Sequence, residues 1–379
     1  MGGPPRSIVG LCEHLAPLVD RLDLCSVDLG PDFGPRVDVD QSLVNLTEVP
    51  CRVWKSLRLY IPRGLKSVLK MRLEGADILH SHGLWAPANA VGASAARKAG
   101  LRFVISPRGS LAPEALARSA WKKSISKRLY VNRALRQAAC IHALAEREAD
   151  CIRRFGLTNP IAVVPNGVDI LAADAESGRN WRAELGDKKL LVSLGRLHPI
   201  KGLDILIEAW RRLADEFPHW LLVLAGPDEG GHLAALEDQV RDANLADRTF
   251  FPGGVYGADK ASLLAGAEMF VLPSRTEGMS VALLEAMGSG LPVVITESCN
   301  FPQIEACGAG LVVDSDAASL AGGMAKMMDA SVDRRRRMGA AGAELIADRY
   351  SWDSLAREML GVYRWLVGQS DAPKCVRLD

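Results

Sequence analysis

Short apolar runs alternate with stretches of helical spacing along the second half of the chain. Four apolar runs predict strands, at residues 190–194, 220–225, 269–272 and 291–295. The first three end at glycine or proline, and apolar residues recur at helical spacing over residues 203–213, 233–243 and 280–288. Strand, break, helix and strand in this order predict a parallel sheet wound with crossover helices.

The first half shows the same alternation less regularly. Apolar runs at 76–80 and 102–106 predict strands, and residues 88–100 between them predict a helix. A further run, 161–164, ends at the turn Pro165-Asn166-Gly167. We therefore expect a second α/β domain in this half, built on the same plan.

The turn after residue 164 predicts a division into domains of residues 1–170 and 171–350. A length of 379 residues also fits two domains, at roughly 100–200 residues each. The start of the chain departs from the usual plan, because no apolar strand precedes Gly2 and Gly3. A doubly wound domain usually opens with a strand that feeds a glycine loop, so either the first strand is absent or the domain is built differently.

Composition and charge narrow the class of protein. With 48% hydrophobic and 24% charged residues the chain is globular, which excludes a disordered or collagen-like protein. The net charge of +1 argues against nucleic acid as a partner. Residues 1–169, however, carry 24 Lys and Arg against 15 Asp and Glu, whereas the remainder carries 22 against 30. The basic residues of the first half form either a solvated helical face or a surface for an anionic partner, such as a phosphate-bearing acceptor or an acidic membrane.

Cysteine usage and apolar run length indicate the cellular setting. The eight cysteines are scattered with no C-x-x-C pair, so neither a zinc nor a redox site is predicted. No apolar run approaches the ~18–20 residues that span a bilayer, and no signal segment is recognisable. We expect a cytoplasmic protein, with peripheral contact at the inner face of the plasma membrane left open.

Strand-end residues of the second half carry the clearest candidate chemistry, because open α/β sheets bind ligands beyond the carboxyl ends of their strands. Arg196 and Lys201 follow the strand at 190–194 and could hold one diphosphate; the alternative is an ordinary exposed loop. Glu277 and Glu285 could accept hydrogen bonds from hydroxyls of one extended ligand; the alternative is a capping Glu277 and a solvated Glu285. Close approach of backbone to an anion is expected at Gly278, Met279, Ser280 and Val281.

Two residues of the first half lie at comparable positions. His80-Ser81-His82 follows the predicted strand 76–80, and His82 could be a hydrogen-bond donor or proton carrier; the alternative is a structural histidine. No third ligand lies nearby in sequence, so no metal is expected. Arg108 follows the strand at 102–106 and could project into a cleft; the alternative is a surface arginine in a turn.

In these motifs the chain resembles the retaining glycosyltransferases of family 4, which have the two-domain GT-B fold. The resemblance is strongest from Val163 to about Tyr350, and the motifs that carry it occur in the family's order and spacing. They are Pro165-Asn166-Gly167-Val168-Asp169, Gly195-Arg196-Leu197 with Lys201-Gly202, Ala225-Gly226-Pro227, and Pro273-Ser274-Arg275 with Glu277-Gly278-Met279-Ser280 and Glu285. The fold implied is α/β, with two Rossmann-like doubly wound domains facing a cleft.

The resemblance implies a role for each of these residues. Arg196 and Lys201 match the pair that holds the donor diphosphate, Glu285 the ribose ligand and Glu277 the contact to the donor sugar. Val255 and Lys260 lie in what resembles the loop beside the nucleobase, and Gly2 and Gly3 match glycines beside the donor phosphates. The first domain would bind the acceptor, and a helix at about 351–367 would cross back to it.

One residue departs from the family pattern. Many relatives have a histidine near the anomeric centre where this chain has Arg108, which stabilises negative charge but is no base near neutral pH. His82 is then the better candidate for orienting the acceptor.

The activity implied is retaining, metal-independent transfer of a sugar from a nucleotide diphosphate to a hydroxyl, with no cofactor. The loop at 106–109 and Trp121-Lys122-Lys123 resemble bacterial members that build exopolysaccharide or lipopolysaccharide on glycan or polyprenyl-diphosphate-linked acceptors. Two alternatives stay open: a phosphorylase of the same fold, which would release sugar phosphate without nucleotide, and a non-catalytic sugar-nucleotide-binding module.

Overall fold

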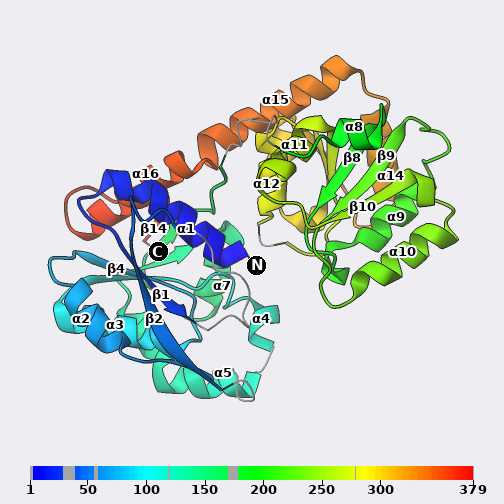
Figure 1. The fold of residues 1–379 in the computed structure, drawn as a ribbon. Helices are drawn as coiled ribbons and strands as arrows, with labels where there is room; N and C mark the ends of the chain where they lie inside the picture. The colour runs from blue at the N-terminus through cyan, green and yellow to red at the C-terminus, as the bar shows by residue number, and fades with distance from the viewer. Residues whose placement is uncertain are drawn as a thin grey trace. The chain divides into compact units, whose positions relative to one another are not determined.

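A computed structural model describes residues 3–28, 39–54, 59–117, 120–169, 178–277 and 279–378 of the chain. The chain divides into two compact units, Met1–Gly167 together with Trp352–Asp379, and Val168–Ser351 (Figure 1). The sequence placed the division near residue 170. Helix α16 (Trp352–Leu366) belongs to the first unit, although it follows the second in the chain.

The second unit contains a six-stranded parallel sheet in the order β10-β9-β8-β11-β12-β13. Its strands are β8 (Lys189–Leu194), β9 (Trp220–Ala225), β10 (Thr249–Gly253), β11 (Ala267–Leu272), β12 (Val293–Thr296) and β13 (Gly310–Val313). Its helices are α8 (Trp181–Leu185), α9 (Leu203–Arg211), α10 (His232–Asp242), α11 (Gly257–Gly266), α12 (Val281–Gly288), α13 (Gln303–Cys307), α14 (Ala317–Met328) and α15 (Val332–Arg349).

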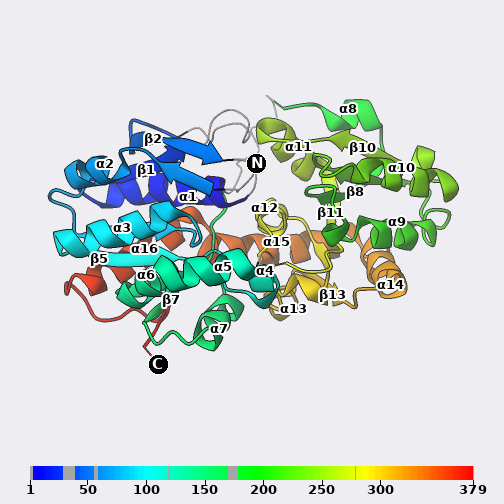
Figure 2. The ribbon, with the colours of Figure 1, turned by 90° about the horizontal axis from the view of Figure 1, so that it is seen from below.

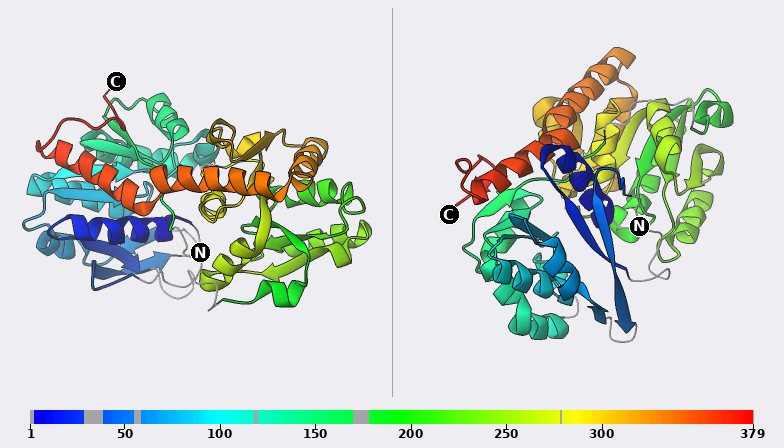
Figure 3. Two further views of the ribbon diagram at one scale, coloured as in Figure 1. Left: turned by 90° about the horizontal axis from the view of Figure 1, so that it is seen from above. Right: turned by 60° about the vertical axis from the view of Figure 1, so that its left-hand side comes forward.

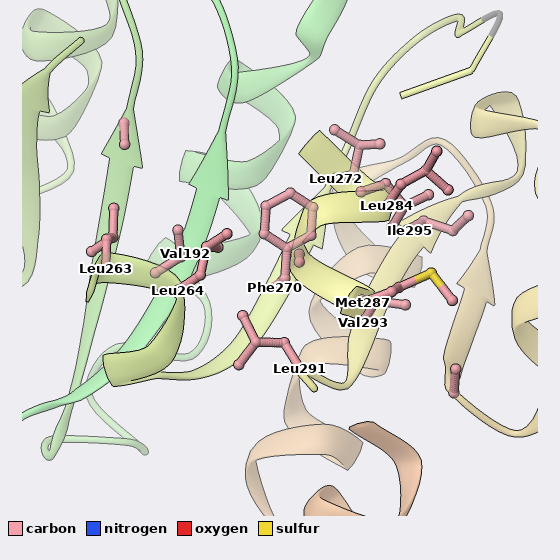
Figure 4. Packing of buried hydrophobic residues seen from close by; sticks show 14 of the residues in the cluster. Val192, Leu263, Leu264, Phe270, Leu272, Leu284, Met287, Leu291, Val293 and Ile295 are labelled. Carbon is pink, nitrogen blue, oxygen red and sulfur yellow. The ribbon is translucent and has the colours of Figure 1, made fainter. Parts of the chain in front are cut away.

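Helices cover both faces of this sheet, because its strands carry apolar residues on both faces. Every residue of β9 and β12 is buried, as near-continuous apolar strands of a parallel sheet require. One core cluster gathers Phe270, Leu284 and Met287 between the sheet and α12 (Figure 4). A second cluster packs Trp210 of α9 and Met324 of α14 against the opposite face. The strands at 190–194, 220–225 and 269–272 and the helices at 203–213, 233–243 and 280–288 are therefore present within a few residues of their predicted bounds.

The first unit contains two sheets. The larger has the order β14-β7-β6-β5-β4, parallel except for β14, and the smaller has the order β1-β2-β3. The strands are β1 (Asp23–Asp28), β2 (Asn45–Trp54), β3 (Leu59–Pro62), β4 (Ile78–His82), β5 (Arg102–Ser106), β6 (Cys140–Ala143), β7 (Ile161–Val163) and β14 (Val376–Arg377). The helices are α1 (Gly3–Leu15), α2 (Leu65–Arg72), α3 (Pro87–Ala99), α4 (Pro113–Ala117), α5 (Ala120–Ser126), α6 (Asn132–Gln137), α7 (Glu146–Arg154) and α16.

Helices cover both faces of the larger sheet. Helices α1 and α16 run side by side and pack on the face that carries Val104 and Cys140 (Figure 3). On the other face, α3 and α6 pack over Phe103 and Ile105 (Figure 2). The unit is therefore an α/β layer structure, as the alternation of strand and helix predicts.

The two sheets are not joined among the described residues. There, β1 pairs only with β2 and β4 pairs only with β5. Cys25 of β1 and Leu79 of β4 nevertheless pack in one apolar cluster. The first described element is helix α1, so no strand precedes it in the described part of the chain.

Candidate active site

The candidate site of the second unit is built from the loops that follow β8 and β11. From β8 the chain proceeds through β9 and β10 on one side, and then returns to β11 on the other side of β8. A reversal of this kind is where ligands bind in open α/β sheets, beyond the carboxyl ends of the strands. A small cavity at this place is lined in part by Arg196, Lys201 and Leu272.

Lys201 and Glu277 connect the two loops. Lys201 Nζ lies 2.5 Å from Glu277 Oε1, and both side chains are largely buried, with 16% and 11% of their surface exposed. Ser274 Oγ donates to the same carboxylate oxygen at 2.8 Å. Glu277 therefore does not cap helix α12, which was the alternative interpretation of its sequence position.

Gly202 allows these loops to meet. Its φ is +64°, and a Cβ at this position would lie 2.1 Å from the carbonyl oxygen of Pro273. Close by, the Arg275 backbone N–H donates to Ile200 O at 2.9 Å. Only glycine accepts both the positive φ and the close approach without strain.

Arg196 is held more loosely than Lys201. Its guanidinium lies 2.5 Å from Glu229, with 50% and 44% of the two side chains exposed. An ion pair this exposed contributes about 0–1 kcal/mol, so an incoming anion can compete for the arginine. Glu229 was not anticipated from the sequence, because it follows a different strand, β9.

Helix α12 begins beside the same loops. The Ser280 hydroxyl caps the helix by accepting from the Leu283 N–H at 3.4 Å. No acceptor for the N–H groups of Met279, Ser280 and Val281 is found among the residues that the structure describes. These groups match the amides predicted to point at an anion. Gly278 lies outside the described residues.

Lys260 and Glu285 form a second ion pair. Lys260 Nζ lies 2.6 Å from Glu285 Oε1, with 11% and 16% of the side chains exposed. Lys260 lies in helix α11, so its placement in a loop was wrong. Val255 precedes that helix and is buried. Glu285 is therefore largely buried and paired, and it is not the solvated residue of the alternative interpretation.

A second group of candidate residues gathers inside the first unit. His80 and His82 lie within β4 rather than after it, because the strand ends at His82 and not at residue 80. Their ring centroids are 4.2 Å apart. His142 of β6 lies 5.3 Å from His80, and His80 Nδ1 lies 2.7 Å from the hydroxyl of Tyr363 in α16.

Arg108 is part of this group and is not a surface arginine. It donates to Nδ1 of His82 from Nε at 3.4 Å and from Nη2 at 3.2 Å. Its Nη1 donates to Ser7 Oγ at 2.8 Å and to Asn166 Oδ1 at 3.0 Å. The residue has a φ of +52°, a conformation that non-glycine residues rarely adopt.

The surroundings set the charge states of this group. Burial and the nearby Arg108 charge hold the pKa of His82 well below its usual range, and burial does the same for His80. Burial lowers the pKa of His142 to about 3 and that of Arg108 to about 10. All three imidazoles are therefore neutral at pH 7 and Arg108 is charged. Because Arg108 donates to Nδ1 of His82, the His82 proton resides on Nε2, which can only donate.

Some members of these groups had no recognisable signal in the sequence. Gly3 is the first residue of helix α1 and not a loop residue, and Gly2 lies outside the described residues. Ser7 lies one turn further along that helix. Asn166 belongs to a turn that the sequence does reveal, whereas His142 and Tyr363 reach the group only through the packing of β6 and α16.

Neither a metal site nor a spanning helix is found in the part of the chain that the structure describes. No group of three or more His, Cys, Asp or Glu side chains there could hold a metal ion. No helix there combines the length and the apolar character needed to cross a bilayer.

Two family models match the chain and together cover most of it. Residues 2–167 match the model described as "Glycosyl transferase 4-like domain". Residues 177–345 match the model described as "Glycosyl transferases group 1". The two matches divide the chain where the two compact units divide.

Curated relatives align with about half of the chain. A GDP-mannose-dependent alpha-(1-6)-phosphatidylinositol monomannoside mannosyltransferase of Mycobacterium tuberculosis is 31% identical over 224 residues, which are 55% of this chain and 57% of that protein. The lipopolysaccharide core biosynthesis mannosyltransferase LpsB of Rhizobium meliloti is 31% identical over 192 residues, 48% of this chain and 52% of that protein. The aligned part thus spans little more than half of these relatives.

Solved structures match nearly the whole chain. Sucrose-phosphate synthase of Thermosynechococcus elongatus has a TM-score of 0.73 at 22% identity, covering 97% of this chain and 94% of that one. WaaG, a glycosyltransferase involved in lipopolysaccharide biosynthesis, has a TM-score of 0.69 at 18% identity, covering 97% of both chains. At these identities the likeness concerns the fold alone, and it confirms the predicted GT-B fold.

Proposed function

Because the chain belongs to the glycosyltransferase family that these two models describe, we propose that it moves a sugar from a nucleotide diphosphate donor to a hydroxyl of an acceptor. The observation that carries the proposal is the meeting of Lys201 and Glu277 at the point where strand order reverses in the second unit. At this edge of the sheet, a cation and unpartnered backbone amides can bind phosphates, and a carboxylate can accept from hydroxyls. The edge therefore suits a ligand that has both kinds of group.

In this proposal the second unit binds the donor. Lys201 has three N–H donors, so it can keep its bond to Glu277 and still donate to a diphosphate. Arg196 leaves the exposed Glu229 and adds a second cation. The amides of Met279, Ser280 and Val281 contact the phosphates. Glu277 accepts from hydroxyls of the sugar.

The nucleoside is bound further along helix α12. Glu285 accepts from the ribose hydroxyls through the oxygen that Lys260 leaves open, since a carboxylate has about four acceptor positions. Val255 and Lys260 border the base.

The proposed reaction is substitution with retention at the anomeric carbon. The bond between that carbon and the diphosphate oxygen breaks while a bond to the acceptor oxygen forms on the same face. The acceptor proton passes to the departing diphosphate oxygen, so no protein base is needed. Arg196 and Lys201 stabilise the charge that develops on the leaving group. The side chains supply this charge themselves, so we expect neither metal nor cofactor.

The first unit is proposed to bind the acceptor. His82 donates from Nε2 to an acceptor hydroxyl, and Arg108 holds the imidazole in this tautomer through Nδ1. The named relatives are a phosphatidylinositol monomannoside mannosyltransferase and a mannosyltransferase of lipopolysaccharide core biosynthesis. We therefore propose a glycan or polyprenyl-diphosphate-linked acceptor in bacterial cell-surface glycan synthesis. The enzyme would act in the cytoplasm, at the inner face of the membrane, and nucleic acid is no partner.

Replacement of the central cation tests the proposal. Lys201→Ala should lower kcat for sugar transfer by about a hundredfold or more, as loss of one preorganised charge at a leaving group does. The matched control is Lys98→Ala, which removes an exposed lysine at the end of α3 in the other unit. Equal kcat for wild type and Lys201→Ala would refute the assignment of this site.

A further inference from the structure

One helical stretch of the first unit exposes apolar side chains at regular spacing. Helix α5, the π-helical turn η4 (Lys127–Val131) and α6 follow one another without a break from residue 120 to 137. Trp121, Ile125 and Leu129 are 66%, 52% and 72% exposed. They are three of the eight large apolar side chains exposed in the described part of the chain, and they recur every fourth residue. Such spacing places them on one face of the helix.

This stretch is anchored to its unit from the opposite side. Val131, Ala134 and Leu135 are buried and belong to the core cluster that includes Phe103 and Ile105. The exposed apolar row is therefore not a poorly packed core face, because the stretch already has a separate core face. Figure 1 shows α5 at the periphery of the first unit.

The stretch that carries the exposed row is basic and contains no acidic residue, although Lys123 and Lys127 lie over the rings of Trp85 and Phe155 of the unit itself. Residues 120–137 contain six basic residues and no Asp or Glu: Lys122, Lys123, Lys127, Arg128, Arg133 and Arg136. Lys122 Nζ lies 5.4 Å from the centre of the Trp121 ring. Arg128, Arg133 and Arg136 are exposed and form no ion pair with any carboxylate that the structure describes.

We infer that the face of residues 120–137 bearing Trp121, Ile125 and Leu129, here called the docking face, binds to the surface of an anionic lipid bilayer. An apolar row bordered by cations is the pattern of helices that lie in the headgroup region, with the apolar side chains inserted and the cations at the lipid phosphates. Lysine and arginine stems are long enough to follow the apolar side chains inward.

Other occupants fit this face less well. A second copy of the chain would bring the exposed arginines of the two docking faces against each other, which like-charge repulsion opposes. An acidic protein would satisfy the cations, but one helix face with three apolar side chains is small beside the ~1,200–2,000 Å² that a stable protein interface buries. Binding to a headgroup layer depends on the buried apolar area together with the attraction of cations to anionic lipids, and this face supplies both. A lipid-linked acceptor would explain why the enzyme binds a membrane. The inference rests on the proposed function in this respect alone.

The test is binding of the whole chain to vesicles at low salt, without donor or acceptor. Wild type should bind equimolar phosphatidylglycerol and phosphatidylcholine vesicles at least tenfold more tightly than vesicles of phosphatidylcholine alone. The triple variant Trp121→Ser, Ile125→Ser, Leu129→Ser should lose about tenfold or more of this affinity. A matched control, Leu43→Ser, Val332→Ser, Leu378→Ser, removes three apolar side chains exposed elsewhere and should bind like wild type.

A charge variant separates the two contributions. A triple variant should abolish binding to the anionic vesicles: Arg128→Glu, Arg133→Glu, Arg136→Glu. Each basic residue near such a surface raises the affinity roughly fivefold. The matched control makes the same charge change on exposed arginines of α15 and should reduce binding far less. It is Arg334→Glu, Arg336→Glu, Arg337→Glu. Circular dichroism should show all variants folded, because every substituted side chain is exposed.

Three results would overturn the inference. They are failure of wild type to bind anionic vesicles, equal binding to neutral vesicles, and unchanged binding by the serine variant of the docking face. Binding of an acidic polypeptide such as polyglutamate in place of vesicles would likewise contradict it. Nucleotide-sugar titration of the same variants keeps the two proposals apart: the docking-face variants should bind donor like wild type. If the chain binds vesicles but no nucleotide sugar, the proposed function is contradicted and the inference about the docking face still holds.

Discussion

Lys260 and Glu285 pair in a nearly buried setting, so removing one partner leaves the other charged and unpaired. Glu285→Gln should therefore lower the free energy of unfolding of the second unit by about 1–3 kcal/mol. The same change should weaken donor binding, because the carboxylate is the proposed ribose ligand. Chemical denaturation and calorimetric titration measure the two effects.

A second substitution separates stability from binding. Lys260→Met together with Glu285→Gln removes both charges and should regain much of the lost stability, because no buried charge stays unpaired. Donor affinity should not return. If the double variant regains donor binding together with stability, Glu285 acts only as a structural partner of Lys260.

The neutral histidines of the first unit make its stability depend on pH. Their folded pKa values are depressed, so below about pH 6.5 the unfolded chain binds protons that the folded chain does not. Stability should be full above that pH and should fall as the pH drops toward 3, where His142 itself titrates. Three such groups give a slope of up to about 4 kcal/mol per pH unit.

Denaturation of the first unit between pH 7 and 5.5 checks this slope. His142→Gln should reduce the slope by about a third, because one of the three contributing groups is removed. Burial raises the pKa of Glu148, which opposes the trend, since the folded chain then binds a proton more readily than the unfolded chain. A stability that is constant or rises as the pH falls would contradict neutral, buried imidazoles.

The candidate residues were predictable from sequence where they follow strands directly. Arg196, Lys201 and Glu277 belong to loops at the ends of β8 and β11, and the sheet order brings those loops together. Their ion-pair partners were not predictable. Lys260 reaches Glu285 from another helix, and Glu229 reaches Arg196 from the loop after β9. Such contacts depend on how helices pack on the sheet, which apolar periodicity does not encode.

At the scale of elements, Gly202 determines how the two loops of the candidate site meet. Gly202→Ala should destabilise the second unit by about 3 kcal/mol or more, because the methyl group meets Pro273 O and the φ of +64° is strained. Gly231→Ala is the matched control, since its φ is +78° and nothing lies within 4 Å of an added Cβ. The control should lose only about 1–2 kcal/mol.

Thermal unfolding and sugar transfer measure this comparison. Gly202→Ala should also lose transfer activity, because the displaced loop carries Lys201, whereas Gly231→Ala should retain it. Equal effects of the two substitutions would show that the close approach to Pro273 has no consequence.

Elements with strong periodicity were predicted well and the others were not. Buried parallel strands such as β9 are continuous apolar runs bounded by glycine or proline, which sequence reveals. The strand β1 reads DLCSVD and is half-exposed, so its apolar signal is weak. The end of β4 was misplaced because His80 and His82 are polar residues that pack against Tyr363 and Arg108 inside the unit, where the sequence indicated a strand end.

At the scale of the whole molecule, charge follows the division into units. The unit of Met1–Gly167 with Trp352–Asp379 contains 28 Lys and Arg against 18 Asp and Glu, and Val168–Ser351 contains 18 against 27. The near-zero total therefore hides a basic unit and an acidic unit. A basic unit suits an anionic acceptor or lipid surface. Within the acidic unit, Arg196 and Lys201 line the cavity where the donor phosphates are proposed to bind.

The central claim is that the second unit binds a nucleotide diphosphate sugar through Lys201, and calorimetric titration with a panel of such sugars tests it most directly. One donor class, uridine or guanosine, should bind wild type and raise its thermal stability by mass action, by about 2.7 kcal/mol at a hundred times Kd. Lys201→Ala should bind the same donor at least tenfold more weakly, and Lys98→Ala should bind it like wild type. Absence of binding by every nucleotide sugar, or equal affinity of wild type and Lys201→Ala, would contradict the claim.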